Sequence, residues 1–218
     1  LKNKQVAVSR SVVIHKLTPH EQEIHVTCSM DVIHGALEEV KFSVPNGFQI
    51  SQVTTDLLSQ WEIIEPPKNT TDSRKRLLVK LREPTREDFV LNIVATRNRG
   101  AVGEWKAMDI RPIDVAGHVS VVGVLADIQL QSTKLVADGV IAIDHEFLLA
   151  AIPQSLQATN RGNPAKIVAA YYAPQKDYSI SASFLRPSPE LIIKSTSRLV
   201  IDDQRLELQG GISLISRH

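Results

Sequence analysis

The histidines that come nearest to a metal-binding pattern are His20 and His25, with Glu21 directly after the first of them. The zinc-protease pattern H-E-x-x-H works because it places two imidazoles four residues apart on one face of a helix. Here the second histidine is one residue too far along, at about 500° of helical rotation instead of about 400°. The segment also runs into a predicted strand, where an odd separation points two side chains to opposite faces. We therefore predict no metal site and no cofactor.

No arrangement of catalytic side chains stands out elsewhere. His145 is the most acid/base-like group, but it begins a predicted short helix, where neighbouring carboxylates are favoured by the helix dipole. The carboxylate pairs Asp202-Asp203 and Glu38-Glu39 are adjacent residues that point to opposite faces of a strand, so they do not form the paired acids of a glycosidase. Motifs for a nucleophile elbow, a P-loop or a dinucleotide site are absent from the sequence. We predict no catalytic residue.

A basic stripe is the most informative charge pattern. Arg76, Lys80 and Arg82 share one face of a predicted strand, and the leucine and valine side chains between them share the other. One interpretation is a solvated outer face whose long cations discourage edge-to-edge pairing. The other is a stripe that binds an acidic polysaccharide or lipid headgroups. Nucleic acid is not predicted as a partner, because the net charge is only +1 and no aromatic residues alternate with the cations.

The two tryptophans receive different interpretations. Trp105 follows Gly100 and Gly103 in a predicted turn, where its ring could be presented to a sugar. It therefore joins Arg76, Lys80 and Arg82 as a candidate ligand-binding residue. Trp61 is in phase with Ile63, which predicts a place in the core.

Composition limits the class of protein. Of 218 residues, 43% are hydrophobic and 22% are charged, which is typical of a globular chain. Cys28 is the single cysteine, so no disulfide forms within the chain, and its phase with apolar neighbours predicts a small buried side chain. The uncharged stretch at residues 115–126 is shorter than the roughly 18 apolar residues that a spanning helix needs. We predict no membrane-spanning segment.

The dominant hydrophobic period is two. Val40, Phe42 and Val44, for example, alternate with polar residues and end at the turn Pro45-Asn46-Gly47. About a dozen such segments predict an all-β fold, a large antiparallel β-sandwich of about twelve strands that is similar to a super-sandwich. At most one or two short helices are expected, the clearer one over residues 144–151 with Asp144 as its N-cap. The strand–helix–strand alternation of an α/β enzyme is missing.

The organisation of the chain is predicted as a single β-sandwich domain over residues 1–218, cut from a larger protein. The alternative is a split within residues 100–115. The alternation at residues 206–214 repeats that at 24–32, as if a second sandwich module began there. Two loop markers are the glycosylation-like motif Asn69-Thr70-Thr71 and the polar segment 157–164.

One stretch of the chain, from Ile24 to Ile128, has a familiar succession of apolar segments and turns. It resembles β-sandwich segments of very long uncharacterised envelope or secreted proteins of planctomycete-like bacteria. The resemblance implies a large multi-sandwich protein outside the cytoplasm and carries over no catalytic or ligand residue. The segments on which it depends are residues 37–48, Trp61, 77–81 with Pro84, 89–95, 110–115 and Gly117.

These observations favour a non-enzymatic structural or interaction module of a larger bacterial envelope or secreted protein. The expected partners are other domains of the same chain, and polysaccharide or protein beyond it. The expected location is the periplasm, the cell surface or the medium. The alternative function is an accessory or catalytic β-domain of a carbohydrate-active enzyme that binds polysaccharide, an argument from fold analogy.

Overall fold

The computed structural model describes residues 5–66, 74–152, 156, 165–187, 190–201 and 203–217. The Asn69-Thr70-Thr71 motif, the loop 157–164 and Asp202 lie outside these residues. The chain divides into two compact units, Leu1–Leu185 and Arg186–His218. The alternative boundary at residues 100–115 therefore falls inside the first unit.

The fold is all-β and sandwich-like, as the alternation of apolar residues predicted. The described residues form sixteen strands and one helix, against about twelve strands expected. The excess comes partly from β8, β9 and β12, which are only four, three and two residues long. Strands this short contain too little alternation to be recognised in a sequence.

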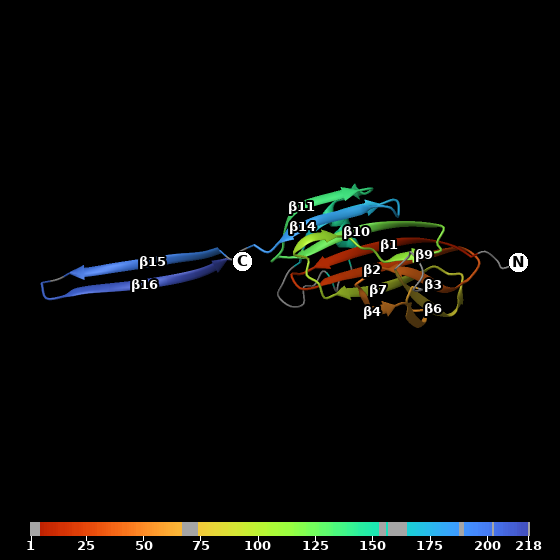
Figure 1. Cartoon of the computed structure of the whole chain (residues 1–218), viewed down its shortest axis with the longest axis horizontal. Helices are drawn as coiled ribbons and strands as arrows, with labels where there is room; N and C mark the ends of the chain where they lie inside the picture. Colours follow the sequence, from red (N-terminus) through yellow and green to blue (C-terminus); the bar gives the residue numbers. More distant parts are fainter. Residues whose placement is uncertain are drawn as a thin grey trace. The chain divides into compact units, whose positions relative to one another are not determined.

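The first unit is built on a seven-stranded sheet (Figure 1). Strands β1 and β10 run parallel, and the other neighbours run antiparallel. In spatial order the strands are β12 (Ile141–Ala142), β13 (Ala165–Ala173), β10 (Gly117–Asp127), β1 (Val6–Leu17), β2 (Gln22–His34), β7 (Phe89–Arg97) and β4 (Gln49–Thr54).

Two smaller sheets cover one face of the large sheet. Their cores share that face, because Val13 of β1 belongs to the first core and Leu17, four residues further along the same strand, belongs to the second. The first is β5 (Leu58–Ile64), β6 (Lys75–Thr85), β3 (Leu37–Val44) and β9 (Arg111–Ile113), and the second is β11 (Gln131–Asp138), β14 (Ser179–Leu185) and β8 (Gly103–Lys106).

The helix α1 (His145–Ala151) forms a third, small core with the opposite face of the large sheet. Asp144 caps it, as predicted, by accepting a hydrogen bond from the Glu146 amide at 3.0 Å. Leu148 packs above Gly123, where a Cβ would lie 2.7 Å from a leucine methyl, so glycine permits the close approach of helix and sheet.

The second unit is a hairpin of β15 (Glu190–Ile201) and β16 (Leu206–Arg217), paired antiparallel along their full length. Two strands make a single layer, so the hairpin has no second sheet of its own to cover either face.

Candidate interaction surfaces

The hairpin places most of its large aliphatic residues on one of its two faces. Directly opposite residues of an antiparallel pair lie on the same face, so the register Ile193↔Leu214, Leu199↔Leu208 and Ile201↔Leu206 gathers large aliphatic side chains on one side. The other side presents Lys194, Thr196, Arg198, Glu207, Gln209 and Ser213, together with the aliphatic residues Ile192, Val200 and Ile215. We call the first side the apolar face; its large residues are Ile193, Leu199, Ile201, Leu206, Leu208, Ile212 and Leu214.

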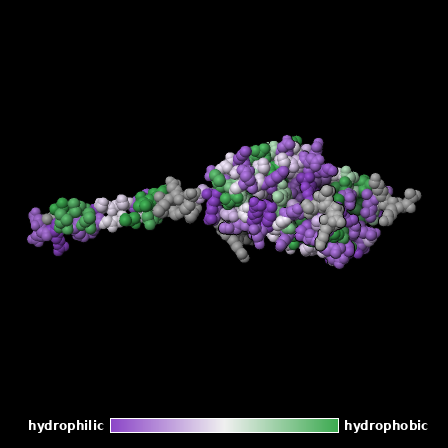
Figure 2. Space-filling view, in the orientation of Figure 1, coloured by the Kyte–Doolittle hydropathy of each residue, from purple (hydrophilic) through white to green (hydrophobic). Residues whose placement is uncertain are grey.

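Every large residue of the apolar face is more than half exposed, from 53% for Leu199 to 76% for Ile212. The face has two aliphatic groups separated by Ser195, Ser197 and Gly210, which are small. Figure 2 shows them as two green regions along the hairpin with a paler stretch between. Seven such side chains offer on the order of 800 Å², about what one partner contributes to a stable interface of standard size.

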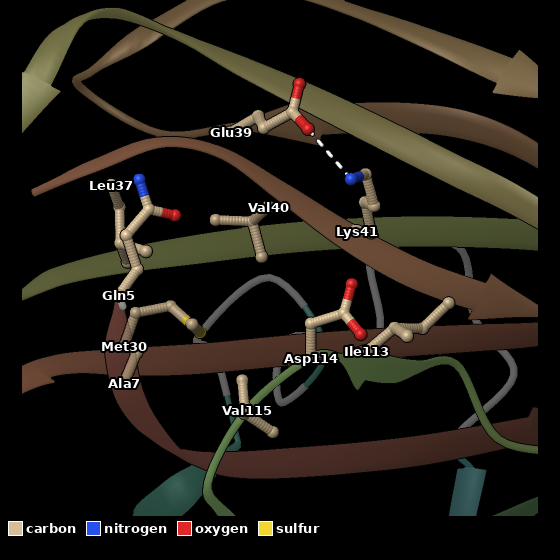
Figure 3. Close-up of a pocket in the computed structure, with 10 residues that line it drawn as sticks. All are labelled: Gln5, Ala7, Met30, Leu37, Glu39, Val40, Lys41, Ile113, Asp114 and Val115. Atoms are coloured by element: carbon tan, nitrogen blue, oxygen red, sulfur yellow. Dashed lines mark ion pairs between the residues drawn. The ribbon is translucent and has the colours of Figure 1, made fainter. Parts of the chain in front are cut away.

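A second candidate is a pocket of about 220 Å³ in the first unit, between β1, β2, β3 and the turn from β9 to β10 (Figure 3). Its apolar lining includes Met30, Val40 and Val115. Polar groups surround them: Glu39 and Lys41 form an ion pair at 2.8 Å between Oε1 and Nζ, and Asp114 faces the same space. A small cavity of this kind suits one short side chain or a small organic molecule.

A buried polar seam lies between the two cores of the large sheet. It consists of Ser9, Ser11 and His15 on the inner face of β1, His118 and Ser120 on β10, and Asp109, Arg111 and Tyr178 from the elements above. Asp109 lies in the connection that leads from β8 to β9, that is, from one small sheet to the other. The seam therefore joins three sheets at one place.

Asp109 holds the seam together. Its Oδ2 accepts hydrogen bonds from Nη2 and Nε of Arg111 at 2.9 and 3.2 Å, and its Oδ1 lies 3.5 Å from Nε2 of His15. The Arg111 guanidinium also donates to the Lys176 carbonyl and stacks 5.0 Å from the centre of the Tyr178 ring. Burial raises the pKa of Asp109, but His15, Tyr178 and Arg111 outweigh it and lower that pKa to about 2.

The seam contains a serine–histidine contact, with 2.8 Å between Ser9 Oγ and His118 Nδ1. A nucleophilic serine must reach its substrate, whereas Ser9 is only 2% exposed and does not line the pocket in Figure 3. Burial also lowers the pKa of His118, which favours a neutral ring. The contact satisfies two polar groups in the seam and gives no basis for a catalytic assignment.

Beside the seam opens a cavity of about 620 Å³ whose charges nearly cancel. Its lining includes the cations Arg74, Lys106, Arg111 and Lys176 and the carboxylates Asp109, Asp138 and Asp177, and the three guanidinium nitrogens of Arg111 already have partners. This balance selects neither an anion nor a cation.

The structure reverses the interpretations of the two tryptophans. Trp105, on β8, is 4% exposed and makes edge contacts with His15 and Phe184, at centroid distances of 5.4 and 6.0 Å. Its ring is therefore not presented to a sugar, because the short strand β8 replaces the turn that the glycines suggested. Trp61 lies on β5, an edge strand, and is 37% exposed although it shares the core-facing phase of Ile63.

Arg76, Lys80 and Arg82 all lie on β6, as predicted. Lys80 pairs with Glu62 at 3.5 Å, and Arg82 donates to the Leu58 carbonyl at 2.9 Å. Lys80 also lies opposite Glu39 in the register with β3. The structure thus does not bring Trp105 together with the three cations, and binding of a polyanion by the stripe stays a prediction.

Within the described part of the chain, no group of three His, Cys, Asp or Glu residues could hold a metal ion. His25 instead contacts Glu23, with 2.8 Å between Nε2 and Oε2. Cys28 is buried as predicted, and burial raises the pKa of its thiol to about 11, which leaves it protonated and unreactive. No helix among the described residues is long and apolar enough to cross a membrane.

Sequence reasoning did not single out the apolar face of the hairpin or the pocket residue Asp114. The alternation in β15 and β16 was visible, but a sequence does not show that an alternating strand lacks a covering layer. Asp114 occurs between two apolar residues in a short segment with no chemical motif, so no signal distinguishes it from an ordinary turn residue.

No protein-family model matches this chain, and comparison with curated proteins likewise finds no match. Among solved structures, it is similar to an M1 zinc metallopeptidase from Deinococcus radiodurans, with TM-score 0.47, 10% identity, and coverage of 93% of this chain and 46% of that chain. A putative protease from Parabacteroides distasonis gives TM-score 0.43, 8% identity, and coverage of 81% and 40%. This chain spans less than half the length of either protein, and likenesses this distant carry no information about activity.

Proposed function

We propose that the chain is a non-catalytic interaction module of a larger protein, and that the apolar face of its hairpin docks on another domain of the same polypeptide. The observation that carries the proposal is the set of seven Ile and Leu side chains, each more than half exposed, on one side of a two-stranded ribbon. A two-stranded hairpin is marginally stable in water, so its lasting order requires a cover.

The composition of the apolar face favours a permanent partner. The energetic hot spots of recognition surfaces are enriched in Trp, Tyr and Arg. The apolar face has only aliphatic residues among its large side chains, such as Leu199 and Leu208, which resembles a domain core cut in half. A domain on the same polypeptide is always present at high effective concentration and therefore supplies such a cover.

The test compares serine substitutions on the two faces in the 218-residue chain. Leu199→Ser and Leu208→Ser remove aliphatic groups from the apolar face, whereas Val200→Ser is the matched control on the other face of the same ribbon. We expect the unchanged chain to bind the dye ANS, each apolar-face variant to lose at least a third of that fluorescence, and Val200→Ser to retain it. The unfolding midpoint of the first unit should not move.

Two outcomes would overturn the proposal. If the unchanged chain binds no dye, the apolar face is not an uncovered surface. If sedimentation shows a dimer at micromolar concentration that Leu208→Ser dissociates and Val200→Ser does not, the partner is a second copy and not a neighbouring domain. A larger effect is expected in the full-length protein, where the partner domain would cover Leu208. There Leu208→Ser should destabilise the hairpin by about 2 kcal/mol, measured by hydrogen exchange.

The setting of this module in a bacterial envelope or secreted protein, and the resemblance to planctomycete-like proteins, stay predictions of the sequence. Polysaccharide binding by Arg76, Lys80 and Arg82 also stays a prediction. A glycan array in which Arg76→Ala abolishes a signal, with the fold intact, would support it.

A further inference from the structure

The pocket in Figure 3 contains an exposed carboxylate that is not ion-paired with any described residue, that of Asp114. Asp114 forms no hydrogen bond or ion pair within the described residues, although it is close enough to Lys41 to help raise the pKa of that ammonium, after the larger effect of Glu39. It lies in the turn that joins β9 to β10. The pocket thus has one charge that the fold itself does not neutralise.

The backbone at Asp114 is held in an unusual conformation. Its φ is +63°, and it is the one non-glycine residue with positive φ among those described. This left-handed conformation costs a non-glycine residue on the order of 1 kcal/mol, although aspartate tolerates it better than most. The turn accordingly places a carboxylate at the pocket, at a position whose backbone conformation would be easier for glycine to adopt.

The other charges at the pocket largely cancel. The Lys41 ammonium binds the Glu39 carboxylate at 2.8 Å, so the pair contributes little net charge. The side-chain amide of Gln5 adds a carbonyl oxygen that can accept a hydrogen bond. What remains is a net negative pocket with hydrogen-bond acceptors and an apolar lining that includes Met30, Val40 and Val115.

We propose that this pocket binds an aliphatic ammonium or guanidinium group, with the cation at Asp114 and its hydrocarbon stem on Met30 and Val40. Such a group is carried by a free alkylamine or by a lysine or arginine side chain of a partner. The volume of about 220 Å³ admits one stem of this kind and excludes a drug-sized ligand.

The test is an NMR titration of the isotope-labelled 218-residue chain with n-butylammonium, and with n-butanol and butyrate as neutral and anionic controls. A ligand of five heavy atoms should bind with a Kd of roughly millimolar order. We expect saturable shifts at the amides of Lys41, Asp114 and Val115 with butylammonium alone. Nα-acetyl-lysine N-methylamide separates the two sources: tighter binding than butylammonium indicates a basic side chain, and equal binding indicates a free amine.

Three variants decide the role of the charges. Asp114→Asn retains a residue that tolerates positive φ, and we expect it to weaken binding at least tenfold. Lys41→Met removes the competing cation, and we expect it to tighten binding at least twofold, an effect that a purely structural role would not produce. Asp177→Asn, a surface change elsewhere, should leave the affinity unchanged. Equal binding of butyrate, absence of pocket shifts, or retention of affinity in Asp114→Asn would each overturn the proposal.

Discussion

Strand β2 of the sandwich and strand β16 of the hairpin have the same alternation of apolar and polar residues, but opposite burial. Ile24 and Met30 of β2 are 0% and 1% exposed. Leu206 and Ile212, which occupy the corresponding positions of the repeated sequence pattern in β16, are 73% and 76% exposed. Both strands are fully paired with a neighbour, so backbone hydrogen bonding does not account for the difference. The difference is the second layer that covers β2.

The comparison shows what alternation specifies. A period of two determines which side chains share a face, but it does not determine what that face contacts. In the sandwich the covering sheets are part of the same unit. In the hairpin the same pattern leaves the aliphatic side chains exposed.

The largest expected effect is at the polar seam of the sandwich. Asp109→Asn removes a buried charge that Arg111 and His15 face, and we expect a loss of about 3 to 5 kcal/mol in the free energy of unfolding. Chemical denaturation followed by the fluorescence of buried Trp105 measures it. The exposed control Asp56→Asn should change stability by less than about 0.5 kcal/mol.

A matched pair of leucines compares the two units directly. Leu91→Ala, at a fully buried position of β7, should cost about 2 to 5 kcal/mol, since it leaves a cavity in the first core. Leu208→Ala should cost less than about 0.5 kcal/mol in the 218-residue chain, because that side chain is already exposed. Equal losses in global denaturation experiments would contradict the distinction between the units.

Acid should destabilise the sandwich through two carboxylates. The pKa of Glu23 is lowered to about 2, chiefly by its hydrogen bond with His25, and that of Asp109 is also about 2. A folded pKa below the unfolded value means that the stabilisation is complete above about pH 4.5 and is lost as the pH falls toward 2. Unfolding measured from pH 6 to 2 should show this decline.

The smallest effect is expected at the surface. Glu23→Gln weakens contacts with Lys16 and His25 on the partly exposed face of β1 and β2, which should cost at most about 1 kcal/mol near neutral pH. It should also reduce the dependence of stability on pH between 4.5 and 2. An unchanged slope would show that Glu23 does not contribute to the acid response.

Much of the fold could be predicted because local pattern and packing agree. Alternation in β2, β3 and β7, the turn after Val44 and the Asp144 cap all appear in the structure as the sequence indicates. The interaction surfaces could not be predicted in the same way. Trp105 became buried because β8 joined a sheet, an event that depends on β14, about eighty residues further along the chain. Asp114 became a pocket residue through the approach of β1, β2 and β3, which no local pattern encodes.

Hydrogen exchange at single amides of the 218-residue chain tests the central claim most directly. We predict that amides of β2, such as that of Cys28, exchange only by global unfolding, whereas those of Leu199 and Leu208 in the hairpin exchange within about tenfold of free-peptide rates, because the uncovered ribbon opens readily. Strong protection of the hairpin amides in a monomeric chain, comparable to that of β2, would contradict the account.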